Sequence, residues 1–400
     1  MRKYAKKIIV FSLIALFVIS GMCSKHFIHY IKDDLLSFVK TDTSFSEFTT
    51  NVNSHSVEKT LYHGRIIDFN SFIMRLSGKS VVEKDDSTVI RLNNGYLYGS
   101  FSKTSNSSIK EYADSVNELY KTATQNSANF LFVMEPSKGM EKQLPLCIDN
   151  YYAKSCDNFI YQLNKQNIPT LNLVDKMKED KISEETMFFA TDHHWKPESG
   201  FWATGKILAD LNNRYSFEYN KNITDLNNYN IKIYKDWFLG SQGKKVGRYF
   251  TKLGADDISL ITPKFDTHLI EEQPNKNEVR DGDFTNSVLF MEKIDTKDYY
   301  NLNPYAVYSG GDFRLQIIKN ELSDNNNKIL IVRDSYSCAT VPFLSLAAKE
   351  VHVVDVRDGD WYVGDKINVH KYIEENKPNY VIVAYNIGAI DEGSDCFNFK

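Results

Sequence analysis

The stretch KILIVRDSYS, residues 328–337, decides the fold class of this 400-residue chain. Its four consecutive apolar residues, 329–332, include three β-branched side chains, which is typical of a strand buried on both faces of a parallel sheet. The strand ends in Asp-Ser, and a helix is expected over 340–348. Ser335 should therefore lie at the carboxyl end of a central strand and near a helix N-terminus, where free N–H groups stabilise an oxyanion.

Strands and helices alternate on both sides of this stretch. Residues 129–135, 351–356 and 380–385 are further apolar runs that predict parallel strands beside 328–333. A short strand is expected at 169–174, two strands around an Asn-Asn-Gly turn within 86–101, and helices at 108–127, 151–166, 201–211, 313–320 and 367–376. The alternation predicts an α/β fold, a parallel sheet with helices on both faces.

The segment 213–300 breaks this alternation. It is rich in Asn, Tyr, Lys and Asp, and its short apolar runs are not separated by helical patterns. We expect it to form an inserted subdomain over one end of the sheet. Because ligands of open parallel sheets bind at the carboxyl ends of the strands, we expect the chemistry there.

A second polar motif, ATDHHWKPESG, occupies residues 190–200. Its proline is a natural first helical residue, so the Asp and both His lie on a loop that enters a helix. In the D-x-H spacing, Asp192 and His194 can point the same way, whereas His193 points elsewhere, to a structural hydrogen bond. A serine nucleophile needs an imidazole to take its proton and a carboxylate to orient that imidazole. Asp192, His194 and Ser335 are therefore candidate catalytic residues.

Each of these residues has a second interpretation, and for Ser335 it is the N-cap of the following helix. His193 and His194 could cap the following helix, or bind a metal together with Asp192, although no second His/Cys cluster is evident, and we predict no metal site. Asp334 could replace Asp192 as the orienting carboxylate, but its place beside the serine favours a role at the helix start. Trp195 is either a packing residue or a platform for a sugar ring.

The two motifs together resemble those of the DHHW family, relatives of the alginate O-acetylation proteins within the SGNH hydrolase superfamily. The resemblance covers roughly residues 85–390. The strings that carry it are TDHHW at 191–195, RDSYSCATVPFL at 333–344, VVDVR at 353–357, GGDF at 310–313 and FLGSQGKKVG at 238–247. One departure is that Ser337-Cys338 stands where a Gly-Asn pair is common.

The resemblance implies an SGNH-hydrolase-like (flavodoxin-like) sheet and a role for each motif residue. Ser335 would be the nucleophile, His194 the general base, and Asp192 the carboxylate that orients it. The implied function is transfer of an acyl group, most simply acetyl, to a cell-surface or exported polysaccharide, or its removal. A transferase of this type would need a multi-span membrane acyltransferase as a partner to supply the acyl group. The alternative is an inactive surface-glycan or spore-coat binding protein with the same fold.

Several further residues are expected to line the cleft. Gly310 and Gly311 either form a turn or donate a backbone N–H group to the oxyanion. Tyr336 is expected at the cleft, and Asp355 and Arg357 either pair with each other or line it. Lys244 and Lys245 form either a solvated turn or a contact with an anionic glycan.

The N-terminus predicts the compartment. Four cations, Arg2, Lys3, Lys6 and Lys7, precede an uncharged run at 8–24, which is the pattern of a signal anchor or signal peptide. We favour the anchor because no clear small-x-small cleavage site precedes residue 24, and Met22 argues against a lipoprotein cysteine at position 23. The positive-inside rule then places residues 25–400 outside the cytoplasm, with 25–84 as a stalk and 85–400 as the main domain.

Composition and cysteine content exclude other classes. The chain has 48 Lys+Arg against 52 Asp+Glu, a net charge of −4, which argues against a nucleic-acid binder held by a basic face. Neither a phosphate-binding nor a dinucleotide-binding glycine motif occurs, so no cofactor is predicted. Cys147 and Cys156 are close enough in sequence for a disulfide, which export would permit, or they are two free thiols.

Overall fold

The computed structural model describes residues 63–84, 87–99, 103–139, 144–145, 148–149, 151–360 and 362–400. The predicted anchor and most of the predicted stalk lie outside these ranges. Two compact units, 1–77 and 78–400, divide the chain; the described part of the first is helix α4 (His63–Leu76). Within the described ranges, every helix is too short or too polar to cross a membrane.

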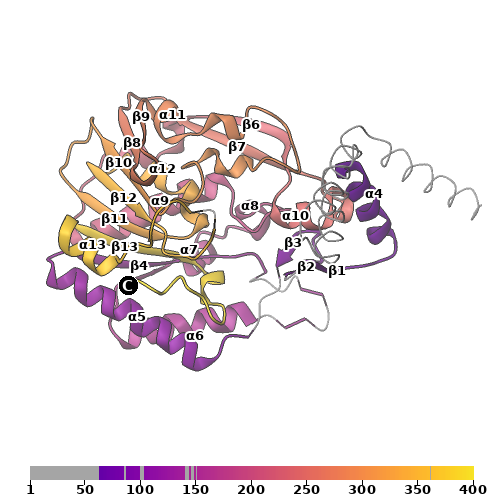
Figure 1. Ribbon diagram of the computed structural model, residues 1–400, viewed down its shortest axis with the longest axis horizontal. Helices are drawn as coiled ribbons and strands as arrows, with labels where there is room; N and C mark the ends of the chain where they lie inside the picture. The colour runs from indigo at the N-terminus through magenta and orange to yellow at the C-terminus, as the bar shows by residue number, and fades with distance from the viewer. Residues whose placement is uncertain are drawn as a thin grey trace, which may run out of the picture. The chain divides into compact units, whose positions relative to one another are not determined.

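The second unit is built around one eight-stranded sheet (Figure 1). Its strand order is β5-β4-β13-β11-β12-β10-β8-β9. The first five are parallel, namely β5 (Thr170–Asn172), β4 (Asn129–Glu135), β13 (Tyr380–Asn386), β11 (Lys328–Arg333) and β12 (Glu350–Val354). The last three, β10 (Leu315–Asn320), β8 (Leu269–Gln273) and β9 (Glu278–Gly282), pair antiparallel. The four predicted parallel strands are confirmed, and the sheet as a whole is mixed.

Helices cover both faces of this sheet and form a core on each face. The side chains of β11 alternate between these two cores. Leu330 and Val332 pack in the same core as α5 (Asn106–Gln125), α6 (Tyr151–Lys165) and α13 (Val369–Asn376). Ile329 and Ile331 pack in the core that contains α9 (Pro197–Tyr215) and α12 (Val341–Leu344). The remaining α-helices of this unit are α7 (Leu173–Glu179), α8 (Glu184–Met187), α10 (Ser241–Val246) and α11 (Phe284–Val288). The predicted α/β fold with two helical layers is confirmed.

The helix predicted at 313–320 is wrong, because this segment is strand β10. Its residues alternate between partly exposed and buried positions, and it pairs with β12 on one side and β8 on the other. The consecutive β-branched Ile317 and Ile318 favour a strand, and the hydrogen bonds of two neighbours outweigh the weak helical spacing. The helix predicted at 340–348 is also shorter than expected, because α12 ends at Leu344.

The predicted insertion at 213–300 is only partly separate from the sheet. Strands β6 (Tyr229–Phe238) and β7 (Asp256–Pro263) form a two-stranded ribbon of their own. Strands β8 and β9 instead extend the main sheet at its antiparallel edge. Helix α10 lies in the connection between β6 and β7, and this short helix borders the candidate active site.

The predicted hairpin within 86–101 is present. Strands β2 (Ser87–Arg91) and β3 (Leu97–Gly99) pair antiparallel, and β1 (Val81–Lys84) adds a third strand. Gly95 in the turn has φ of +90°, a conformation that glycine adopts without strain. Of the two alternatives for Cys147 and Cys156, the structure favours free thiols: Cys156 is a buried free thiol, and Cys147 lies outside the described residues.

Candidate active site

Ser335 is the first residue of the short 3₁₀ helix η7 (Ser335–Ala339), which follows β11 directly. Asp334 caps this helix, because its Oδ1 accepts from the Tyr336 N–H at 2.9 Å. Its Oδ2 accepts from the backbone N–H of Asn386 at 3.0 Å and from the Asn386 side chain at 2.6 Å. Asp334 thus ties the serine turn to the end of β13 and has the predicted helix-start role.

Asp192 and His194 lie beside this serine although 141 residues separate His194 from it in the chain. His194 Nε2 is 2.8 Å from Ser335 Oγ. His194 Nδ1 is 2.5 Å from Asp192 Oδ1, which also accepts from the His194 backbone N–H at 3.0 Å. The imidazole therefore bridges the carboxylate and the hydroxyl, at distances suited to proton transfer.

The loop that carries Asp192 is held from two sides. On one side, the Ser241 backbone N–H at the start of α10 donates to Asp192 Oδ2 at 2.6 Å. On the other, the buried Asp256 carboxylate accepts from the backbone N–H groups of Ala190 and Thr191 at 2.6 and 2.8 Å. The orientation of Asp192 thus depends on the connection between β6 and β7.

The environment of Asp192 favours its ionised form. Burial alone would raise the pKa of this carboxyl, but the positive charge available on His194 and the hydrogen bonds from it hold the pKa well below its usual value. An ionised carboxylate at this distance stabilises the imidazolium that forms when His194 accepts a proton.

The His193 ring lies against the His194 ring, with centroids 3.8 Å apart, but its side-chain hydrogen bond goes elsewhere, as predicted. Its Nδ1 lies 2.8 Å from Ser241 Oγ, and its backbone carbonyl accepts from the Tyr336 hydroxyl. Desolvation and the neighbouring His194 lower the pKa of His193, so it is neutral at pH 7. The ligand atoms of Asp192, His193 and His194 lie within 4.8 Å of one another, but Asp192 already contacts His194 Nδ1, and His194 Nε2 already contacts Ser335.

Aromatic side chains fix the imidazole and the serine turn. Tyr305 stacks on His194 with ring centroids 4.2 Å apart. The Tyr305 hydroxyl and the Trp195 indole N–H both donate to the Tyr336 carbonyl at 2.8 Å. Trp195 is fully buried, so it is a packing residue and not a sugar platform.

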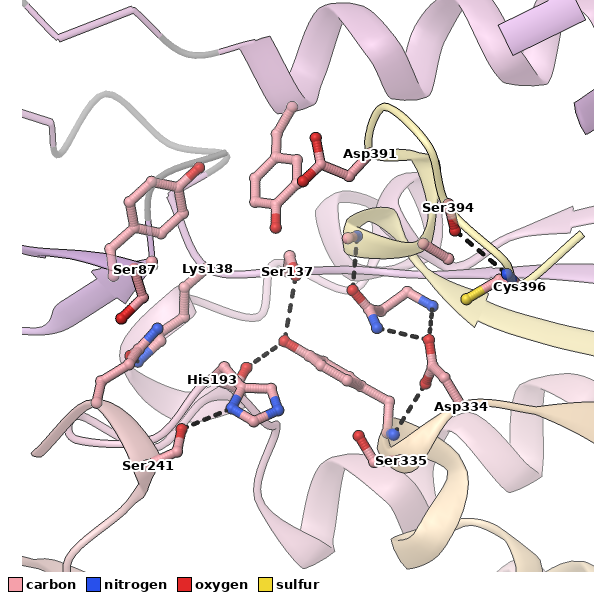
Figure 2. Close-up of a pocket in the computed structure, with 18 of the residues that line it drawn as sticks. Ser87, Ser137, Lys138, His193, Ser241, Asp334, Ser335, Asp391, Ser394 and Cys396 are labelled. Atoms are coloured by element: carbon pink, nitrogen blue, oxygen red, sulfur yellow. Dashed lines mark hydrogen bonds between the residues drawn. The ribbon is translucent and has the colours of Figure 1, made fainter. Parts of the chain in front are cut away.

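A cavity of about 810 Å³ opens over the serine turn (Figure 2). Ser335 and His193 line it, whereas Asp192 and His194 lie behind them. Its walls come from the hairpin β2–β3, the turn after β4, helix α10 and the segment 386–396. The lining side chains are mostly hydroxyl, amide and charged groups, among them Ser87, Thr88, Tyr98, Ser137, Tyr152, Ser241, Gln242, Asn386 and Ser394.

The other predicted residues divide between the cavity and its supports. Tyr336 and Arg357 line the cavity, and Asp355 is fully buried and pairs with Arg357 at 2.6 Å. Gly310 and Gly311 do not line it. They have φ of +72° and +108°, and the Gly311 carbonyl accepts from Arg333, which supports the turn interpretation.

Of the two adjacent lysines, one reaches the cavity. Lys245 lines it and donates to Ser87 Oγ at 2.9 Å, while Lys244 donates to the Leu302 carbonyl.

Sequence reasoning missed Lys138 and Asn386, which both line the cavity. Each follows a strand that was predicted from its apolar run, so the rule that ligands bind at the carboxyl ends of parallel strands could have found them. Nothing in their local sequence marks them, because neither residue belongs to a motif.

Comparison with known proteins places the fold. Residues 95–222 match the family model of the SGNH hydrolase-like domain of the acetyltransferase AlgX. Bacillus cereus PatB1 superposes with a TM-score of 0.65 at 20% identity, over 79% of this chain and 100% of that chain. The PatB1 structure with a sulfonyl adduct gives 0.64 at 19% identity, over 80% and 99%.

A DHHW family protein from Eubacterium siraeum superposes with a TM-score of 0.57 at 18% identity, over 80% of this chain and 96% of that chain. No curated protein matches the sequence. These likenesses confirm the predicted resemblance, and the chain has an SGNH-hydrolase-like fold.

Proposed function

We propose that this protein transfers an acetyl group to, or removes it from, a hydroxyl group of a cell-surface or exported polysaccharide. The observation that carries the proposal is the His194 imidazole, which lies 2.5 Å from Asp192 and 2.8 Å from Ser335. The match of residues 95–222 to an acetyltransferase domain supports acetyl as the transferred group.

In the first half-reaction, His194 Nε2 takes the proton of the Ser335 hydroxyl while Oγ attacks the carbonyl carbon of the acetyl donor. The bond from the carbonyl carbon to the donor oxygen then breaks, and that oxygen takes the proton from His194. The product is an acetyl ester on Ser335. Asp192 stays ionised and stabilises the imidazolium while it exists.

In the second half-reaction, a sugar hydroxyl gives its proton to His194 and attacks the acetyl carbonyl. Ser335 Oγ leaves and takes the proton back. Water in place of the sugar makes the same chemistry an esterase, so the active-site residues serve both reactions.

Two donors beside the serine suit the developing oxyanion. The Ser335 backbone N–H is at the first position of η7 and has no hydrogen-bond partner among the described residues. The Asn386 side chain gives one of its two N–H groups to Asp334 and borders the cavity. These two donors take the role that was one of the two alternatives for Gly310 and Gly311.

The cavity supports a carbohydrate as the substrate. Its polar lining suits a sugar unit, whose hydroxyl groups need many donors and acceptors. The four cations ahead of residues 8–24 support a location outside the cytoplasm. There a donor must be delivered across the membrane, and a multi-span membrane acyltransferase is the partner that we propose.

Labelling with phenylmethylsulfonyl fluoride tests the proposal. We expect one sulfonyl adduct on Ser335 by peptide mass spectrometry, turnover of p-nitrophenyl acetate, and loss of both in Ser335→Ala. Absence of the adduct and of turnover in the folded protein would favour the surface-glycan or spore-coat binding protein with the same fold.

A further inference from the structure

Lys138 is a buried lysine on the turn after β4, and only 2% of it is exposed. Its ammonium lies 2.9 Å from the Phe189 carbonyl, 3.2 Å from Gln242 Oε1 and 3.4 Å from the Ala190 carbonyl. An ammonium has three N–H donors and no acceptor, so these three oxygens use all of them.

The three acceptors belong to the two segments that orient Asp192. Phe189 and Ala190 precede Thr191 and Asp192 in the chain. Gln242 follows Ser241, whose backbone N–H donates to Asp192 Oδ2. We propose that Lys138 is a positioning residue that joins the loop of Asp192 to helix α10 and so sets the orientation of the Asp192–His194 pair.

Lys138 does not act on the substrate directly. Its donors are all engaged and its side chain is buried, although its turn borders the cavity (Figure 2). It acts through Asp192, whose negative charge its ammonium also stabilises.

Three carboxylates and one aromatic ring face Lys138, from four different segments of the chain. Asp192 lies on the loop before α9, Asp256 on β7 and Glu184 on α8, and the Tyr96 ring lies 5.8 Å from the ammonium. Burial lowers the pKa of Lys138 to about 8, against the opposing effect of Asp256, Asp192 and Glu184.

The positioning therefore depends on pH. Above about pH 8 the ammonium becomes an amine, which has two donors for three acceptors and no charge to stabilise Asp192. The protein does not unfold for this reason. Between the folded pKa and the higher unfolded pKa the unfolded chain binds more protons, so this group adds stability as pH rises. Turnover should fall while the fold persists.

The experiment measures kcat and KM for p-nitrophenyl acetate between pH 6 and pH 10 in the full chain. The wild type should lose kcat above about pH 8. Lys138→Met should lower kcat at pH 7 roughly 10- to 100-fold with KM nearly unchanged, because Asp192 is displaced, and should lack this alkaline loss. Lys154→Met, at an exposed position on α6, is the matched control and should behave as the wild type.

Gln242→Glu provides a second variant that keeps the shape of the site. A carboxylate opposite the ammonium should raise the pKa of Lys138, so the alkaline loss of kcat should move up by about one pH unit or more. Kinetics of Lys138→Met within twofold of the wild type, or an alkaline loss that stays in place in Gln242→Glu, would overturn the inference. If Lys138→Met does not fold, the pH profiles of the wild type and of Gln242→Glu still decide whether the inference holds.

The kinetic readouts rest on the proposed function, so the lysine charge is also measured directly. In protein labelled with ¹³C at lysine Cε, the NMR signal that Lys138→Met removes should titrate near pH 8. A titrating lysine without any turnover would count against the proposed function alone. A titrating lysine with turnover that does not follow it would count against the positioning role alone.

Discussion

At the scale of single residues, the two adjacent histidines have different surroundings and should have different importance. His194 contacts both Asp192 and Ser335, whereas His193 contacts Ser241 at the cavity wall. A residue between a carboxylate and a nucleophile acts as part of a unit, and its loss removes the function of the others. A histidine with one side-chain hydrogen bond does not act in this way.

Replacement of the two histidines tests this difference. His194→Ala should lower kcat by roughly 10³-fold or more, nearly as much as Ser335→Ala, and Asp192→Asn somewhat less. His193→Ala removes one hydrogen bond worth about 1 kcal/mol and should cost less than about tenfold. Turnover of a small ester by the purified variants measures both. If His193→Ala were the more damaging of the two, the base would be assigned to the wrong residue.

Gly240 is required because helix α10 lies close against the loop of Asp192. A Cβ atom on this glycine would lie 2.2 Å from Asp192 Cβ and 2.4 Å from its Cα. Gly240→Ala should therefore displace Asp192 and lower kcat roughly 100-fold. Gly205→Ala in α9 is the control, since its Cβ meets only Thr224 side-chain atoms at 3.9 Å or more.

That control should keep full turnover and gain about 0.5–1 kcal/mol of stability, since alanine favours a helix interior over glycine. Equal turnover of Gly240→Ala and Gly205→Ala would show that α10 does not position the carboxylate.

At the scale of secondary-structure elements, the end of β4 holds the serine turn through a buried hydrogen bond. Glu135, the last residue of β4, accepts from Ser337 Oγ at 2.7 Å and is fully buried. Burial, together with the charge of Asp334, raises the pKa of Glu135 well above its usual value. Native Glu135 therefore holds its proton where the unfolded chain has lost it.

This difference in proton binding determines whether the free energy of unfolding rises or falls with pH. Between the unfolded pKa and the higher folded pKa, the native state binds more protons, so stability falls as pH rises. Glu135→Gln keeps an acceptor for Ser337 without an ionisable proton, and it should flatten this fall and raise Tm at pH 8 relative to the wild type. Thermal unfolding from pH 5 to pH 8 measures it, with the exposed Glu111→Gln on α5 as control. A wild-type slope unchanged by Glu135→Gln would contradict the assignment.

The elements also explain what the sequence could predict. The continuous apolar runs of β4, β11, β12 and β13 identified the parallel core, because such strands are buried on both faces. Strand β10 was missed because it lies between β8 and β12, and this pairing decides its conformation. The D-x-H and Asp-Ser motifs identified the three residues that the structure brings together. Lys138 and Asn386 could not be identified as site residues in the same way. Neither belongs to a motif, and only the order of the strands in the folded sheet brings them to the cavity.

At the scale of the whole second unit, the cavity is assembled from parts that are far apart in the sequence. The hairpin β2–β3 forms one wall, α10 from the β6–β7 connection a second, and the segment 386–396 a third. The proposed chemistry uses the serine turn, the loop of Asp192, the Asn386 side chain and the start of α10, whose Ser241 N–H holds Asp192. The rest of the walls, such as the hairpin β2–β3 and the exposed residues of α10, can determine which polymer binds without changing the reaction.

Lys245 tests this separation between binding and chemistry. It is exposed on α10, lines the cavity, and lies 2.9 Å from Ser87 Oγ on the hairpin. Lys245→Glu replaces a charged donor with a carboxylate, so KM for an acetylated polysaccharide should rise roughly tenfold, the value of one charge-assisted hydrogen bond. Turnover of p-nitrophenyl acetate should change little, because a small ester reaches Ser335 without this wall. Lys154→Glu on α6 should change neither constant. An equal loss of turnover on the small ester and the polysaccharide would mean that Lys245 acts through the position of α10, and the cavity walls could then not be separated from the chemistry.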